Sequence, residues 1–242
     1  MTEKNPEQRK ETRDFDTREL CHERLADVFD FHTSPYDRSR RVEVLIDDFL
    51  TEEMLQGKRT LDVGCGLGHF SERLVARGAS VVACDIGPRL LALTKKRAGC
   101  ETVLADALNL VDAFGKESFD LVVSSECIEH TPDPGLALEQ MAAVLKPGGR
   151  IAVSTPNILW QPIVRTATIM KMRVFDGYEN FSSWNSLERK LEDSGVEIER
   201  RSGMHLFPFQ FGFHGFSKWI DQNCQGMRWA MYNLSVLGRK QG

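Results

Sequence analysis

The chain has 242 residues, of which 41% are hydrophobic, so it is long and apolar enough for one domain with a substantial core. Its formal net charge of -4 provides no global positive field for a polyphosphate partner, which argues against a nucleic-acid substrate. The cysteines lack the short paired spacing of zinc sites and redox dithiols, so we expect reduced thiols. The sequence shows neither a signal peptide nor a run of about 20 apolar residues, and we therefore expect no transmembrane segment and a cytoplasmic location.

Helices are predicted to precede the first strand. Apolar residues recur at helical spacing over residues 18–31 and 38–50. From Lys58 onward, short β-branched runs alternate with helical stretches, a pattern typical of parallel strands joined by crossover helices. The predicted strands are 59–63, 80–85, 102–105, 119–124 and 150–154, and the helices between them are 68–77, 88–97 and 134–145.

The C-terminal third has a looser pattern. A capped amphipathic helix is predicted over 183–194, followed by a strand over 196–201 and a final strand over 229–238. Between those strands, residues 206–219 form an aromatic stretch that glycine and proline keep irregular. This stretch can roof an apolar acceptor pocket, and the alternatives are ordinary core, a homodimer contact or a membrane contact.

Three alternating glycines follow the first predicted strand. Gly64, Gly66 and Gly68 permit a tight turn and the close approach of a ligand, but a dinucleotide-binding turn spaces its last two glycines three residues apart. Asp62 would repel a pyrophosphate and can accept hydrogen bonds from an ammonium group. Asp85, at the end of the second strand, can bind both hydroxyls of a ribose. A ribose joined to an amino acid describes S-adenosylmethionine, whereas a plain strand-to-helix turn is the alternative.

Four segments in order carry a family resemblance: 61–68 (LDVGCGLG), 82–85 (VACD), 126–134 (ECIEHTPDP) and 145–149 (LKPGG). Through them the chain resembles the class I S-adenosylmethionine-dependent methyltransferases, in the group that includes the ubiquinone-biosynthesis O-methyltransferases. The resemblance covers residues 58–157 well and the flanks in outline.

This resemblance implies a three-layer α/β, Rossmann-like fold with a seven-stranded sheet, mostly parallel, whose last strand is antiparallel. Residues 1–57 would form an N-terminal helical extension capping the cofactor site. Residues 58–242 would form the methyltransferase domain, with insertions at about 158–182 and 204–227.

The resemblance also implies the cofactor-binding residues. Asp85 would hold the ribose and Asp106 the adenine amino group, while Ser125 and Glu126 would line the methionine end. An arginine of the early helix, Arg38 or else Arg40 or Arg41, can reach the cofactor carboxylate. The full set is Arg38, Asp62, Gly64, Cys65, Gly66, Gly68, Asp85, Ile86, Asp106, Ala107, Leu108, Ser125 and Glu126.

His130 is the candidate catalytic residue. It follows a central strand at the sheet edge where open parallel sheets bind ligands, and an imidazole can remove a proton from a hydroxyl acceptor. A structural role beside the next helix is the alternative. Some ubiquinone-type relatives are taken to bind Mg through a Glu-x-x-Glu-His arrangement, which Glu126, Glu129 and His130 reproduce. We do not favour a metal, because two carboxylates with an imidazole depart from the all-oxygen shell of magnesium.

The leading hypothesis is therefore methyl transfer from S-adenosylmethionine to a small molecule, with S-adenosylhomocysteine as product. O-methylation of a quinone precursor or secondary metabolite is favoured over N- or C-methylation and over an RNA or protein substrate. A noncatalytic S-adenosylmethionine-binding module is the alternative from another class. We assign no role to His205 and His214, near the aromatic stretch.

Overall fold

A computed structural model describes residues 34–170, 177–207 and 212–242. The helix predicted over 18–31 lies outside these residues, as do parts of both predicted insertions. No helix in the described ranges is long and apolar enough to cross a membrane.

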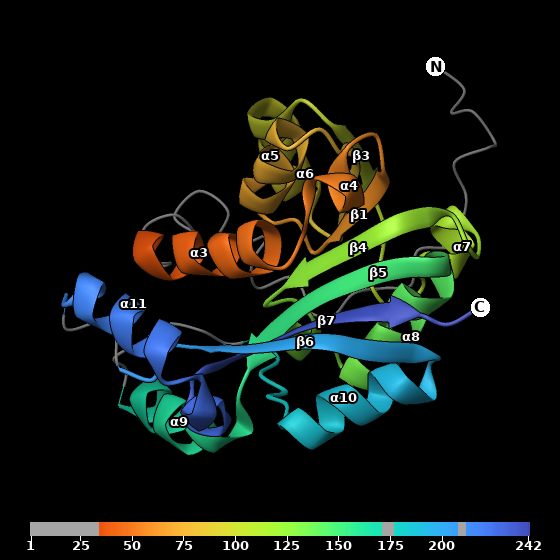
Figure 1. Cartoon of the computed structure of the whole chain (residues 1–242). Helices are drawn as coiled ribbons and strands as arrows, with labels where there is room; N and C mark the ends of the chain where they lie inside the picture. The colour runs from red at the N-terminus through yellow and green to blue at the C-terminus, as the bar shows by residue number, and fades with distance from the viewer. Residues whose placement is uncertain (1–33, 171–176, 208–211) are drawn as a thin grey trace.

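A seven-stranded sheet forms the centre of the molecule, in the order β3-β2-β1-β4-β5-β7-β6 (Figure 1). Strands β1 to β5 pair in parallel, and β7 lies antiparallel between β5 and β6. The predicted fold class is confirmed, and β1 lies beside β4 where the strand order reverses. The strands are β1 Arg59–Val63, β2 Ser80–Asp85, β3 Glu101–Leu104, β4 Phe119–Ser125, β5 Leu145–Pro156, β6 Val196–Met204 and β7 Asn233–Lys240.

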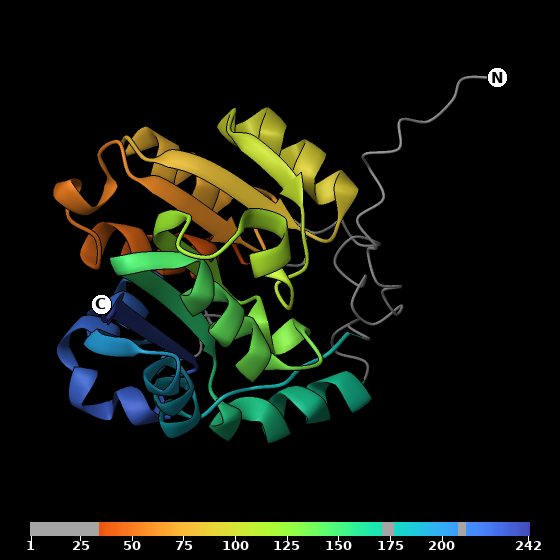
Figure 2. The same cartoon turned by 90° about the vertical axis from the view of Figure 1, so that its right-hand side faces the viewer.

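Helices cover both faces of the sheet (Figure 2). One apolar cluster joins alternate strand residues to α7, α8 and α10, and a second joins the other face to the N-terminal elements and α5. Asp133 caps α8 through a hydrogen bond from Leu136 N, and Pro134 occupies its first turn. The helices are α5 His69–Ala76, α6 Pro88–Ala98, α7 Leu110–Phe114, α8 Pro134–Val144 and α10 Trp184–Asp193.

The early helix begins before its predicted start. Helix α3 spans Pro35–Val42, with Ser34 as its cap, and continues into the π-helical turn η2, Glu43–Asp48. A short helix, α4 (Glu52–Leu55), then leads into β1. Buried Leu45 and Ile46 of η2 anchor this segment to the sheet, which brings α3 to the carboxyl ends of β4 and β5.

Two sequence expectations for the last third are wrong in part. The aromatic stretch contains a regular helix, α11 (His214–Asn223), because its glycine and proline residues lie at or before the helix's first turn. The final strand starts at Asn233, not at 229, because η6 (Gln225–Ala230) precedes it. The Asn157 side chain donates to the carbonyl oxygens of Trp229 and Met231 and holds that turn in place.

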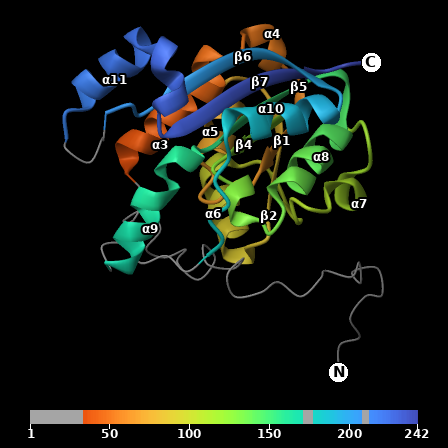
Figure 3. The same ribbon diagram turned by 90° about the horizontal axis from the view of Figure 1, so that it is seen from below.

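The first insertion contains η4 (Ile158–Trp160) and α9 (Gln161–Ile169). Seen from below, α9 and α11 both project from the same end of the sheet, the end where α3 also lies (Figure 3). The carboxyl ends of the parallel strands are therefore surrounded by segments from distant parts of the chain.

Candidate active site

The glycine turn after β1 has the backbone that the sequence predicts. Gly64, Gly66 and Gly68 have φ values of 69°, 51° and 81°, in the left-handed region that favours glycine. A Cβ on Gly64 would lie 2.3 Å from Cys127 Sγ, so this glycine lets β1 approach the end of β4 closely. A Cβ on Gly66 would meet no atom within 4 Å, which leaves its backbone open to a ligand.

Asp85 connects the ends of β1 and β2. Its two carboxylate oxygens accept hydrogen bonds from Gly66 N at 3.0 Å and Gly87 N at 2.9 Å. Asp106 makes a similar local contact by accepting from Leu108 N at 2.9 Å. These bonds hold the acidic loops of neighbouring strands at one edge, where the cofactor's nucleoside is predicted to bind.

The remaining nucleoside-side candidates are mainly buried. Cys65 is packed against Ala83 and Leu91, and Ala107 belongs to the core beneath β3. Both can contact a ligand chiefly through their backbone, because their side chains face inward. Ile86 directly follows Asp85 in the same loop and is half-buried.

Asp62 is more enclosed than its proposed role suggests. Its side chain is only 2% exposed, and Ser71 Oγ donates to Asp62 Oδ2 at 2.5 Å. Burial raises the pKa of Asp62 to about 7, and the negative charge of Asp85 adds to this rise. The contact ties α5 to the glycine turn, whereas binding of the cofactor ammonium stays a prediction.

A second polar cluster lies at the ends of β4 and β5. Ser154 Oγ donates to Glu126 Oε1 at 2.9 Å and lies 2.9 Å from Ser125 Oγ. Arg41 Nη1 donates to Ser125 Oγ at 3.1 Å. Glu126 has a φ of 51°, an uncommon conformation for a non-glycine residue and one that concentrates at functional sites.

Of the three candidate arginines, Arg41 lies at this cluster. It is buried and faces Ser125. Although burial opposes its charge, the carboxylate of Asp37 and the charge of Glu126 raise its pKa. Arg38 instead lines a surface hollow between α3 and α5, beside His69. Arg40 is buried and pairs with Glu43. Arg41 is thus the candidate that contacts Ser125, and which of the three arginines reaches the cofactor carboxylate stays a prediction.

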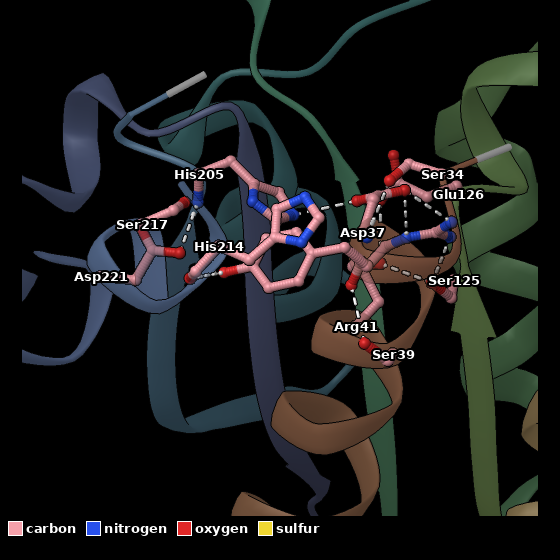
Figure 4. Close-up of polar contacts among 12 residues, drawn as sticks. Ser34, Asp37, Ser39, Arg41, Ser125, Glu126, His205, His214, Ser217 and Asp221 are labelled. Atoms are coloured by element: carbon pink, nitrogen blue, oxygen red, sulfur yellow. Dashed lines mark hydrogen bonds and ion pairs between the residues drawn. The ribbon is translucent and has the colours of Figure 1, made fainter. Parts of the chain in front are cut away.

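Asp37 links Arg41 to His205, which directly follows the edge strand β6 (Figure 4). Its Oδ2 accepts from Arg41 Nη2 at 2.9 Å, and its Oδ1 accepts from His205 Nε2 at 3.0 Å. Although burial opposes ionisation, Arg41 and His205 lower the pKa of Asp37 to about 2. Asp37 was not among the predicted site residues, although its position four residues before Arg41 is the spacing of a helical ion pair.

Two further contacts join α3 to the segment after β6. Tyr36 donates from its hydroxyl to His214 O at 2.9 Å and stacks on the His214 ring with centroids 4.1 Å apart. Asp221 of α11 accepts from His205 N at 2.9 Å and stabilises the left-handed backbone of His205, whose φ is 63°. His205 and His214 therefore connect elements about 170 residues apart, a role that local sequence could not reveal.

His130 lies at the end of the short helix η3 (Ile128–His130). Its Nδ1 is 2.8 Å from Tyr178 O, and because a carbonyl only accepts, Nδ1 carries the proton. In the neutral ring the lone pair is therefore on Nε2, which lies 3.7 Å from Glu129 Oε1. In this tautomer Nε2 is the ring nitrogen that can accept a proton.

The candidate metal ligands are Glu126, Glu129 and His130. In the described parts of the chain, no group of three His, Cys, Asp or Glu residues is arranged so that it could hold a metal ion. Glu129 is 1% exposed and accepts from Thr155 Oγ1 at 3.2 Å. Burial raises the pKa of Glu129 well above its usual value.

Known proteins place this site in context. A family described as methyltransferase domain matches residues 61–153. The ubiquinone biosynthesis O-methyltransferase of Aeromonas salmonicida is 31% identical over 188 residues, which cover 73% of this chain and 79% of that protein. The chain belongs to the class I S-adenosylmethionine-dependent methyltransferases.

A second relative matches over a shorter region of this methyltransferase. The ubiquinone biosynthesis O-methyltransferase of Nitrobacter winogradskyi is 33% identical over 163 residues, which cover 64% of this chain and 62% of that protein. The matched region thus spans less than two thirds of the Nitrobacter relative.

Solved structures confirm the fold of this methyltransferase. A methyltransferase from Thermotoga maritima, described as a possible histamine N-methyltransferase, has a TM-score of 0.67 at 19% identity and covers 91% of this chain and 99% of its own. One from Mesorhizobium loti has a TM-score of 0.63 at 21% identity, with coverage of 82% and 98%. At these identities the likeness concerns the fold alone.

Proposed function

We propose that this methyltransferase methylates an oxygen of a small-molecule acceptor, either a quinone precursor or a secondary-metabolite scaffold. The two relatives described above are ubiquinone biosynthesis O-methyltransferases. The observation that carries the proposal is His130, whose Nδ1 contact with Tyr178 O directs the lone pair to Nε2. A hydroxyl acceptor requires such a base, because it must lose its proton as the new bond forms.

The residues at the sheet edge fit S-adenosylmethionine. Asp85 would bind the ribose hydroxyls, Asp106 the adenine amino group and Arg41 the methionine carboxylate. The open face of Gly66 supports this fit, since a Cβ there would occupy space that a ligand can use. S-adenosylmethionine, when bound, would supply a sulfonium methyl group for the acceptor oxygen to attack, and S-adenosylhomocysteine would be the leaving group and product.

The role proposed for His130 follows from this chemistry. As the acceptor oxygen gains the methyl group, it would lose its proton to His130 Nε2, which carries the lone pair of the neutral ring. Glu129, which accepts a hydrogen bond from Thr155, lies beside the ring, with Oε1 3.7 Å from His130 Nε2. Tyr178 O keeps the ring oriented throughout.

Calorimetry tests the cofactor site. Asp85→Ala should weaken S-adenosylmethionine binding at least about 10-fold, because a ribose loses its acceptor and the glycine turn loses its tie. Asp193→Ala, at the exposed end of α10, is the matched control and should bind as wild type does. Wild-type affinity in Asp85→Ala would contradict the assigned site, and no binding by wild type would exclude the activity.

Turnover measurements test the base. His130→Ala should lower kcat by about 10²- to 10⁴-fold at neutral pH with little change in S-adenosylmethionine affinity. Unchanged kcat would remove His130 from the mechanism. Full activity of the wild type in a metal chelator would in the same assay exclude a required magnesium ion.

A further inference from the structure

Asn233, the first residue of β7, is a buried amide without hydrogen-bond partners. It is 1% exposed, and neither Oδ1 nor Nδ2 meets a partner among the described residues. Buried polar groups in folded proteins are nearly always bonded, because a buried unpaired amide destabilises the fold. This exception therefore requires an explanation.

The position of Asn233 places it in the cluster around Glu126. It lies opposite Pro156 of β5 and Met204 of β6, at the edge where the parallel strands end. Alternate residues of a strand share a face, so Asn233 lies on the same face as Ser235, which is opposite Ser154. Ser154 in turn donates to Glu126.

Asn233 lies close enough to Glu126 to lower the pKa of that carboxyl, which burial raises, yet it forms no bond of normal geometry with it. The amide thus offers one donor group and one acceptor beside a carboxyl group. A hydroxyl is the complementary ligand, because it can accept from Nδ2 and donate to either Oδ1 or Glu126 at once.

The contact between α3 and the residues after β6 lies near this amide. His205 directly follows Met204, the residue opposite Asn233, and is bonded to Asp37 of α3. The contact is made by side chains of separate elements: Asp37 with His205, Tyr36 with His214, and Glu43 with Lys218. Such contacts can separate to admit a ligand without breaking a strand.

We propose that Asn233, together with Glu126, binds a hydroxyl group of the methyl acceptor and so selects phenolic acceptors. The inference rests on the proposed function, which it deepens by naming the residue that recognises the acceptor. Asn233 is a binding residue in this scheme, and proton removal stays with His130.

The experiment compares phenols with their unhydroxylated parents. Calorimetry on the protein saturated with S-adenosylhomocysteine would use 3,4-dihydroxybenzoate against benzoate, and caffeate against cinnamate. Wild type should bind each hydroxylated ligand more tightly than its parent. In Asn233→Leu this advantage should fall by roughly 10- to 100-fold, because the variant offers no hydrogen bond.

Stability provides a second readout. Asn233→Leu should melt roughly 2–4 °C above wild type, because it removes an unpaired buried amide. Ser235→Ala is the matched control, since Ser235 Oγ is likewise buried without a partner in the described chain. It should bind phenols as wild type does.

Each outcome decides the proposal. Higher stability with unchanged phenol binding in Asn233→Leu would overturn it, as would a wild type that does not distinguish phenols from their parents. If the leucine variant does not fold, Asn233→Ser serves in its place, and unchanged phenol binding by it would equally overturn the proposal. S-adenosylmethionine affinity, measured separately, reports on the proposed methyltransferase activity and should be unchanged in these variants.

Discussion

Burial changes the pKa of Asp62, the carboxylate that precedes the glycine turn. With its carboxyl enclosed and bonded to Ser71, its pKa of about 7 lies well above the unfolded value of about 3.9. Between about pH 4 and 7 the folded state therefore holds a proton that the unfolded state has released. The linkage relation then requires stability to fall as pH rises through this window.

Asp62→Asn should remove that dependence. At pH 8 the variant should be more stable than wild type by roughly 1–3 kcal/mol, because it avoids a buried carboxylate and its amide oxygen still accepts from Ser71. Urea unfolding at pH 5 and pH 8 measures the effect. A variant that keeps the wild-type pH dependence would contradict the explanation.

The same substitution separates stability from binding. If the Asp62 carboxylate receives the cofactor ammonium, Asp62→Asn should bind S-adenosylmethionine more weakly even where it is the more stable protein. If the variant and the wild type bound S-adenosylmethionine with equal affinity, the role of Asp62 would be structural: its contact with Ser71 would hold α5 against the glycine turn.

At the scale of elements, α3 is held over the strand ends by partners that lie far away in sequence. Asp37 pairs with both Arg41 and His205, so the segment after β6 helps to place the guanidinium that faces Ser125. The low pKa of Asp37 keeps this carboxylate ionised across the physiological range.

Two substitutions at His205 test this link. Glutamine places its amide nitrogen near the position of Nε2, whereas asparagine reaches only the position of Nδ1. His205→Gln should therefore keep the KM for S-adenosylmethionine near wild type, and His205→Asn should raise it about 5- to 20-fold through the misplaced Arg41.

If backbone strain at residue 205 were decisive, His205→Asn would have the lower KM for S-adenosylmethionine and His205→Gln the higher. Asparagine tolerates the left-handed conformation of residue 205 better than glutamine does. If His205→Asn behaved better than His205→Gln, the backbone and not the Asp37 contact would explain why histidine occupies this position.

At the scale of the whole molecule, the proposed cofactor contacts come from β1, β2, the loop after β3, and β4, together with α3. A ligand that touches all of them should stabilise the fold as a unit. At 100 times its Kd, S-adenosylhomocysteine should add about 2.7 kcal/mol to the unfolding free energy.

Thermal unfolding measures this stabilisation as a rise of roughly 5–10 °C in Tm. Asp85→Ala at the same ligand concentration should show little of the rise. An equal rise in that variant would show that the ligand binds elsewhere.

The central part of the chain could be predicted from local pattern because its elements carry local signals. Short β-branched runs between helical stretches mark β1, β2, β4 and β5, and Asp133 with Pro134 marks the start of α8. The π-helical turn after α3, the start of α11 and the start of β7 have no such signals, since packing against the rest of the chain decides them.

The sequence by itself determined the fold class, the glycine turn, the acidic ends of β2 and β3 and the family, because each depends on residues close together in the chain. Only the tertiary structure decided that Arg41 faces Ser125, that Asp37 meets His205 and that Asn233 lies unpaired beside Glu126. These contacts join α3, β4, β6 and β7, whose proximity follows from strand order and not from spacing. The proposed acceptor side of the site therefore depends on the packing of distant segments, whereas the proposed cofactor side depends on contiguous motifs.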